Sequence, residues 1–505
     1  MKNLYTFLTA LLITAVALGQ PGSLDPSLGN GGFSIIDFEN NKEYPEMIAL
    51  QPDGKLVVAG FYQGNFTGYR FLVARFTENG LPDLSFGDDG LADIDMKGWA
   101  TGVATQDDGK IVVVGGPNAD DHFLALRLLE DGSSDLSFGD EGKVVASFGD
   151  TLAICESMAL LPDGRILLVG EKHNDINNYW PMAVMLFADG AVDPSFGDSG
   201  VALFPEAAFT RSYINDVQVE EDGKIVLGGY RETSIHSQRG WALWRFSPGG
   251  EPDLSFGPNG SASIHMGDNN GYDERINKIR IQPDGSVIAV GFAPANGILY
   301  HGALARYLPD GSLDTSFGQN GKAFPGSGAL QDVWVQPDQK ILAVGSGLYR
   351  FLPDGSPDSG FGTNGAASIE VMGSMIGLRA LLWQPDNKVV AVGQYSTSIF
   401  PIQRDILLSR FYSGLEPVAV QQPGIASPWA VFPNPCRDFL SVQRTSGDSP
   451  PVRARLFNMA GQLALSEELQ GRSWLSVRRL PAGMYGLEIE DRDGRLWQER
   501  VMKAD

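Results

Sequence analysis

Histidine and aromatic residues gather in a few variable stretches of this chain. Four of the five histidines fall there, together with two tryptophans and a tyrosine. The set consists of His122, His173, Trp180, His236, Trp241, Tyr300 and His301. Aromatic rings beside polar side chains can stack on a sugar or hold a peptide, so we take these residues as a hypothetical binding set. Loops also collect such residues without any function, and that alternative stays open.

The spacing of these residues does not match a metal site or a catalytic motif. The chain has no H-x-H or H-x-x-x-H pair and no G-x-S-x-G motif, which are common signs of a zinc site and of a nucleophilic serine. Its 61 acidic residues are too many to single out an acid and base pair. We therefore predict no metal and no cofactor, and we name no catalytic residue.

A turn that recurs seven times divides the chain into similar units. One copy reads "PDLSFGDDG", and two further signatures, such as "QPDGKLVVAG" and "ARFTENG", recur between the copies. The turn aspartates are Asp25, Asp83, Asp135, Asp193, Asp253, Asp314 and Asp358. Each unit of about 50 residues holds four short β-branched or aromatic runs separated by Gly, Asp and Pro. This pattern predicts an all-β fold with a seven-bladed β-propeller.

The residue types repeated in each turn have structural roles. Asp and Ser can hydrogen-bond the nearby backbone, Phe can fill the wedge between blades, and Gly adopts conformations that other residues avoid. Calcium binding is the alternative, but each turn offers one fixed carboxylate instead of the D-x-D-x-D spacing of an oxygen cage. We interpret the repetition as architectural.

The two ends of the repeat region predict how the ring closes. The region begins with a fourth-strand motif that no blade precedes, and it ends with a third-strand motif, "LLSRFYSG", that no fourth strand follows. We therefore expect residues 31–38 to add the outer strand to the blade formed by residues 377–412, which hides an open sheet edge. The propeller is predicted to span residues 20–414.

The units also differ from one another in a regular way. The signature turns barely vary and are expected on one face of the ring. The loops between the second and third strands vary greatly and open on the opposite face. The hypothetical binding set falls in these variable loops.

Two of the repeated motifs resemble those of a known family. The phrases "VDPSFGDSG" and "QPDGKLVVAG" are similar to the delta-60 repeats of exported bacterial proteins, which are regarded as β-propellers. The resemblance covers roughly residues 24–412. It implies a fold and an exported protein, and it implies no reaction.

The chain changes character after a Pro- and Gln-rich linker at residues 415–430. Residues 431–505 read as alternating strands and turns, which predicts a small Ig-like β-sandwich. Their motifs resemble the C-terminal sorting domain of the type IX secretion system of Bacteroidetes. The matching residues are Pro433, Asn434, Pro435, Gly461, Gly483, Tyr485 and Lys503. The resemblance implies recognition by the secretion machinery, followed by release or attachment at the cell surface.

Composition and the amino terminus agree with export. Residues 1–19 read as a signal peptide, with one Lys, an apolar run and small residues before Gln20. No later segment is apolar enough to cross a membrane.

A net charge of -23 makes nucleic acid a poor partner, and two distant cysteines predict no disulfide. We expect a monomer that passes through the periplasm and is secreted or held at the outer cell surface.

These observations lead to one preferred hypothesis and two alternatives. The preferred one is a binding or adhesion module whose ligand is a glycan or a protein. The first alternative is an exported polysaccharide lyase or hydrolase with its site at the axial mouth of the propeller. The second is a structural surface-coat protein.

Overall fold

The computed structural model is built almost entirely of β-strands. Among the described residues the single helical element is the three-residue turn η1 (Pro258–Gly260), so no helix there is long enough to cross a membrane. The structure describes residues 19–503 except for 39–40, 65–67, 93, 95, 118–121, 147–151, 176–177, 205–209, 234–237, 268–272, 296–297, 372–373, 398–402, 416–428, 433–435, 438, 445–452, 459–462, 470–472, 482 and 491–495.

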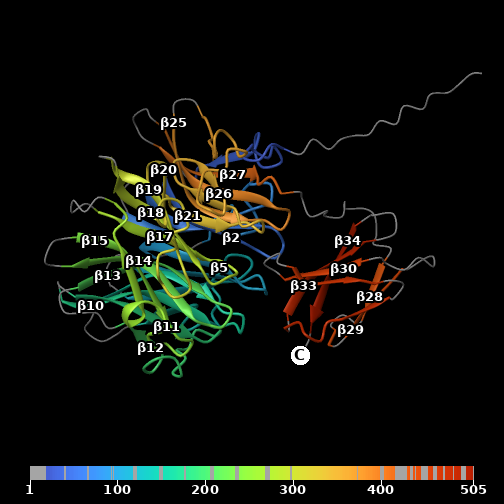
Figure 1. Cartoon of the computed structure of the whole chain (residues 1–505), viewed down its shortest axis with the longest axis horizontal. Coiled ribbons are helices and arrows are strands. Elements are labelled where there is room, and N and C mark those ends of the chain that lie inside the picture. The colour runs from blue at the N-terminus through green and yellow to red at the C-terminus, as the bar shows by residue number, and fades with distance from the viewer. Residues whose placement is uncertain are drawn as a thin grey trace, which may run out of the picture.

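Most strands fall into seven consecutive groups, which are the blades of a propeller (Figure 1). The first three blades are β2 (Lys42–Leu50), β3 (Leu56–Gly64) and β4 (Gly68–Phe76); β5 (Gly98–Thr105), β6 (Ile111–Pro117), β7 (Phe123–Leu128) and β8 (Lys143–Ala146); and β9 (Leu152–Leu160), β10 (Ile166–Asp175), β11 (Asn178–Leu186) and β12 (Val201–Leu203). The next two are β13 (Thr210–Val219), β14 (Ile225–Thr233), β15 (Gln238–Phe246) and β16 (Ser261–Ile264); and β17 (Arg275–Ile281), β18 (Val287–Ala295), β19 (Ile298–Tyr307) and β20 (Lys322–Ser327). The last two are β21 (Asp332–Val335), β22 (Ile341–Val344), β23 (Leu348–Phe351) and β24 (Ala366–Ala367); and β25 (Ser374–Trp383), β26 (Lys388–Thr397) and β27 (Arg404–Tyr412).

The blades close into a ring. Their innermost strands contact one another in a cycle that runs β2, β5, β9, β13, β17, β21, β25 and back to β2. The last blade obtains its outer strand from the start of the chain, because β1 (Phe33–Ile36) pairs antiparallel with β27, with Phe33 opposite Ser409 and Ile36 opposite Ile406. Figure 1 shows this blue segment beside the orange β27. The sheet edge of the last blade is therefore covered.

The core lies in the wedges between neighbouring blades. The middle strands are apolar on both faces, and all six residues of β7 are buried. One wedge joins Val57 and Val73 of the first blade to Ile111 and Leu124 of the second. A strand covered on both sides needs no polar face, which explains the continuous apolar runs in the second signature.

Each repeated turn binds its own blade to the next one. In the first blade, the Asp83 carboxylate accepts hydrogen bonds from the Ser85 amide (3.1 Å) and hydroxyl (2.7 Å). Phe86 is fully buried, and Gly87 has a φ of 54°, which favours glycine. The Gly87 amide then donates to the Asp131 carbonyl of the second blade (2.8 Å). Six further turns repeat this last bond, from Gly29, Gly139, Gly197, Gly257, Gly318 and Gly362.

A buried arginine completes the turn and was missed in the sequence. Arg75, from the third strand, donates from Nε to the Asp83 carboxylate (2.8 Å), and its guanidinium lies 4.5 Å from the centre of the Phe86 ring. It also donates to the Glu130 carbonyl of the next blade. Five other turns have the same ion pair, formed by Arg127, Arg245, Arg306, Arg350 and Arg410. The signal was present, because each of these arginines lies in the third signature.

The third blade makes this ion pair in another way. Its third strand has the buried Met185 where the others have arginine. Arg165, which precedes the second strand, pairs with Asp193 instead (3.1 Å). In the six turns with a third-strand arginine, the motif carboxylate already has protein partners. This supports an architectural role for the turn aspartates over calcium binding.

Two smaller sheets follow the propeller in the sequence. They are β28 (Trp429–Phe432), β29 (Phe439–Arg444) and β32 (Trp474–Ser476), and β31 (Leu463–Glu468), β30 (Arg453–Asn458), β33 (Gly483–Glu490) and β34 (Leu496–Lys503). Residues of both sheets share one apolar core, including Leu440, Leu456 and Leu487. Cys155 and Cys436 are both buried, and they form no disulfide with each other.

Candidate functional site

The loop face is the side of the ring on which the second and third strands of each blade are joined. The predicted binding residues belong to four different blades. His122, just before β7, is half-buried, and its Nδ1 has no hydrogen-bond partner. Trp180 in β11 is half-buried, and Tyr300 in β19 is 55% exposed.

Two other residues of the predicted set lie in the core. Trp241 in β15 is fully buried, and its indole Nε1 donates to the Phe292 carbonyl (3.1 Å). His301 in β19 is also buried and packs edge-on against Phe324. The strands extend further into the expected loops than the turn signals indicated, because β14 and β15 leave only residues 234–237 between them. Neither side chain is therefore available to a ligand on the loop face.

The other two histidines of the predicted set are His173 and His236. His173 lies in β10 with its backbone opposite Tyr179. His236 lies outside the described residues.

Stacked aromatic rings on the loop face form a feature that the sequence did not reveal. At the first blade, Tyr44 stacks on Phe61 with ring centres 4.5 Å apart, and Tyr69 meets Phe61 edge-on at 5.2 Å. The Arg404 guanidinium lies over Tyr44 at 5.0 Å. We call Arg404, Tyr44, Phe61 and Tyr69 the first ladder.

A second group of stacked rings crosses from the third blade to the fourth. Tyr179 lies 5.0 Å from Tyr213, which in turn stacks on Tyr230 at 4.5 Å. Arg211 lies over Tyr179 and Arg239 over Tyr230, at 5.7 and 5.1 Å. We call these five residues the second ladder.

The fifth blade has the third ladder, made of Arg275, Phe292 and Tyr300. Arg275 lies 5.2 Å over the Phe292 ring, and Tyr300 meets that ring edge-on at 5.2 Å. The three ladders arise because the first two strands of a blade place side chains directly opposite each other, as Tyr213 is opposite Tyr230. Cross-strand register cannot be read from a list of loop residues, which is why the ladders were missed.

Two aspartates on the inner strands have structural partners. Asp216 in β13 pairs with Lys278 of the next inner strand (3.0 Å) and accepts the Ile279 amide. Asp332 in β21 accepts the Leu381 amide of β25 (2.8 Å). Burial raises the pKa of Glu156 to about 7. Asp216 and Asp332 thus connect neighbouring blades.

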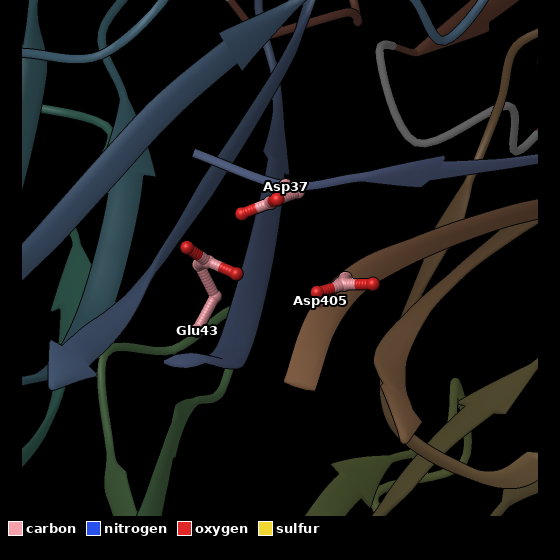
Figure 2. A group of neighbouring side chains, drawn as sticks. All are labelled: Asp37, Glu43 and Asp405. Carbon is pink, nitrogen blue, oxygen red and sulfur yellow. The ribbon is translucent and has the colours of Figure 1, made fainter. Parts of the chain in front are cut away.

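Three carboxylates meet where the ring closes, as Figure 2 shows. Asp37 follows β1, Glu43 lies at the start of β2, and Asp405 lies at the start of β27. One oxygen from each lies within 4.8 Å of the others. Burial, followed by the charge of Asp37, raises the pKa of Glu43 to about 8. Burial and then Asp37 also raise the pKa of Asp405 to about 6. These are oxygen ligands of the kind that hard cations prefer.

The residues that resemble a sorting signal are only partly described. Tyr485 is buried in the C-terminal core, and its hydroxyl donates to the Pro481 carbonyl (2.9 Å). Gly483 begins β33 with a φ of 154°, and Lys503 ends β34 and is buried. Pro433, Asn434, Pro435 and Gly461 lie outside the described residues.

Comparison with protein families gives two matches. The first is described as a domain of unknown function (DUF5122) beta-propeller and matches residues 51–86, 106–138, 220–256, 282–317 and 336–361. The second is described as a secretion system C-terminal sorting domain and matches residues 430–503. A comparison with curated proteins gave no match.

Solved structures show only distant likeness. The extracellular domain of a one component system from B. thetaiotaomicron is 12% identical, with 93% of this chain and 69% of that chain covered and a TM-score of 0.28. A protein of unknown function from Dyadobacter fermentans is 11% identical, with coverages of 77% and 100% and a TM-score of 0.40. A subtype N11 neuraminidase-like protein of A/flat-faced bat/Peru/033/2010 is 10% identical, with coverages of 79% and 99% and a TM-score of 0.39.

The family matches agree with the strand arrangement and confirm the predicted β-propeller. The sorting domain marks export to the cell surface or beyond it and implies contact with the secretion machinery. This chain is therefore an exported protein of DUF5122 β-propeller repeats that carries a type IX secretion system C-terminal sorting domain.

Proposed function

We propose that the protein is a binding or adhesion module that holds a glycan on the loop face of its propeller. The observation that carries this proposal is the set of three ladders, in which arginines lie over aromatic rings next to the variable loops. Sugar rings stack on aromatic faces, and guanidinium groups donate to hydroxyls and carboxylates at fixed angles.

Exposure identifies which rings are available for stacking. Tyr300 is 55% exposed and Tyr69 is 41% exposed, whereas the rings behind them are more deeply packed. Each exposed tyrosine is held edge-on by a phenylalanine, so its orientation is fixed before any ligand arrives. A rigid aromatic side chain loses little conformational entropy on binding, which favours these two residues as contact points.

A glycan array with the purified chain tests this proposal. We expect retention on a subset of oligosaccharides, and we expect Tyr300→Ala or Tyr69→Ala to reduce it by roughly ten-fold or more, in line with the loss of an interfacial anchor. Leu136→Ala is the matched control, because Leu136 is 72% exposed in a repeated turn on the opposite face. Binding of immobilised acidic peptides without glycan binding would replace the glycan with a protein ligand. Equal losses in all three variants would contradict the loop-face assignment.

An enzymatic function is the second candidate, and a buried carboxyl on an inner strand motivates it. Burial raises the pKa of Glu156 on the inner strand β9 to about 7, and a carboxyl that stays protonated near neutral pH can act as a general acid. The test is the release of products from a panel of polysaccharides. Products that disappear in Glu156→Gln but persist in Tyr300→Ala would favour this candidate over the binding module.

A further inference from the structure

The three carboxylates at the closure of the ring come from segments that meet only when the ring is complete. Asp37 extends from the first strand, Glu43 belongs to the first blade and Asp405 to the last blade. Figure 2 shows the three side chains directed toward a common space. We call Asp37, Glu43 and Asp405 the seam cluster.

Glu43 is the member that points most directly to a missing partner. Glu43 is 0% exposed, and its Oε1 accepts a hydrogen bond from the Phe38 amide at 3.3 Å. Its Oε2 is buried without a hydrogen-bond partner. A buried, unsatisfied carboxylate oxygen costs free energy unless a proton or a cation satisfies it.

The positive groups nearby do not supply that partner. Successive side chains on a strand point to opposite faces, and Arg404, next to Asp405, lies over the Tyr44 ring. Among the described residues, no lysine or arginine forms an ion pair with Glu43 or Asp405.

We propose that the seam cluster binds one Ca²⁺ ion, which joins the first and last blades. The oxygens lie within 4.8 Å of one another, and two oxygens bound to the same Ca²⁺ at about 2.4 Å are at most about 4.8 Å apart. All three ligands are carboxylates, the ligands of a hard cation, with no soft sulfur or imidazole group. Asp37 is exposed and gives the ion a route from solvent, and water completes the coordination.

This site stabilises the closed ring and not the open one. Asp405 is distant in sequence from Asp37 and Glu43, and the three ligands assemble only when β1 and β27 pair. An ion that binds the closed ring alone shifts the equilibrium toward it by mass action. The seam cluster shares no residue with the three ladders, and its test uses no glycan, so it stands or falls independently of the proposed function.

Calorimetric titration of the EDTA-treated full chain with CaCl₂, near neutral pH, tests the proposal. We expect one Ca²⁺ per chain and a Tm that rises with Ca²⁺ concentration. Glu43→Gln should weaken binding by at least about ten-fold and remove the rise in Tm, because one of three anionic ligands is lost. Asp107→Asn is the matched control, since Asp107 is exposed in a turn of the second blade, and it should bind Ca²⁺ like the parent chain.

Three results would overturn the proposal. The first is no Ca²⁺ binding up to about 10 mM, well above the range of extracellular modules. The second is unchanged affinity in both Glu43→Gln and the half-buried Asp405→Asn, which also covers the case in which the Glu43 variant fails to fold. The third is tighter binding of MgCl₂ than of CaCl₂, which would assign the seam cluster to the smaller ion.

Discussion

The turn face and the loop face of the propeller are made by the same strands but follow different rules. On the turn face, nearly every blade repeats one arrangement, in which Arg75 and its equivalents pair with an aspartate over a buried phenylalanine. On the loop face, the residue after the second-strand glycine changes from blade to blade: Phe61, Gly116, Glu171, Tyr230, Phe292, Ser346 and Gln394. The repeated contacts between blades therefore constrain the residue types on the turn face, whereas the residue types on the loop face vary.

Acid should disrupt the turn face through all its aspartates at once. Burial alone would raise the pKa of Asp83, but hydrogen bonds from Ser85 and the charges of Arg75 and Lys55 outweigh it and lower the pKa from 3.8 to about 2. The pKa values of Asp25 and Asp135 are also lowered to about 2.

Because these pKa values lie below those of the unfolded chain, the stabilisation is present above about pH 4 and is lost as pH falls through about 2. Each of the three contributes on the order of 2 kcal/mol. We expect unfolding in this window, followed by tryptophan fluorescence against pH. A chain with unchanged Tm at pH 2 would contradict the role assigned to the turns.

Removal of one motif aspartate should give the next largest effect. Asp83→Ala leaves the buried Arg75 guanidinium without its carboxylate, so we expect the free energy of unfolding to fall by about 3–5 kcal/mol in urea denaturation. Asp107→Ala, at an exposed turn position, should stay within about 0.5 kcal/mol. Similar values for the two variants would remove the distinction between motif and ordinary turn aspartates.

The third blade offers a test inside the turn face. Arg75 is 2% exposed at its side chain and reaches the next blade, whereas Arg165 is 31% exposed and pairs with Asp163 as well as Asp193. We expect Arg75→Ala to cost about 3 kcal/mol and Arg165→Ala about 1 kcal/mol. Equal losses of Tm would show that Arg165 fully replaces the buried arginine.

The loop face should show the smallest effect on stability. Tyr300→Ala removes an exposed ring, so we expect a change of about 0.5 kcal/mol or less in the free energy of unfolding, alongside the loss of glycan retention proposed above. A large loss of stability would mean that the loop face, like the turn face, holds the blades together.

Much of the fold could be predicted from the sequence because each blade repeats the same short-range signals. The turn motif, the apolar second strand and the unmatched motifs at both ends are all local patterns, and they indicated a propeller whose first strand lies beside its last blade. The match to β-propeller repeats confirms the fold class, and the structure pairs β1 with β27.

The surroundings of the side chains near the loop face could not be predicted in the same way. Trp241 looked like a loop residue, but β15 begins at Gln238 and carries it into the wedge against the fifth blade. Tyr44 and Tyr213 were overlooked because they lie in inner strands, and their stacking depends on which residues face each other across a sheet. The seam cluster joins residues from both ends of the propeller, so no local pattern reveals it. The Ig-like form of the C-terminal domain stays a prediction.

Because β1 pairs with β27, the propeller can close only when both ends of the repeat region are present. Among the strands of the propeller, β1 comes first in the sequence and is synthesised first, whereas its partner β27 comes last. A nascent chain can stack blades one after another, yet it lacks the final partner until residue 412 has emerged. A chain cleaved near either end of the repeat region keeps six blades but loses the pairing of β1 with β27. The strand edge that this exposes can be cleaved by proteases or can start aggregation.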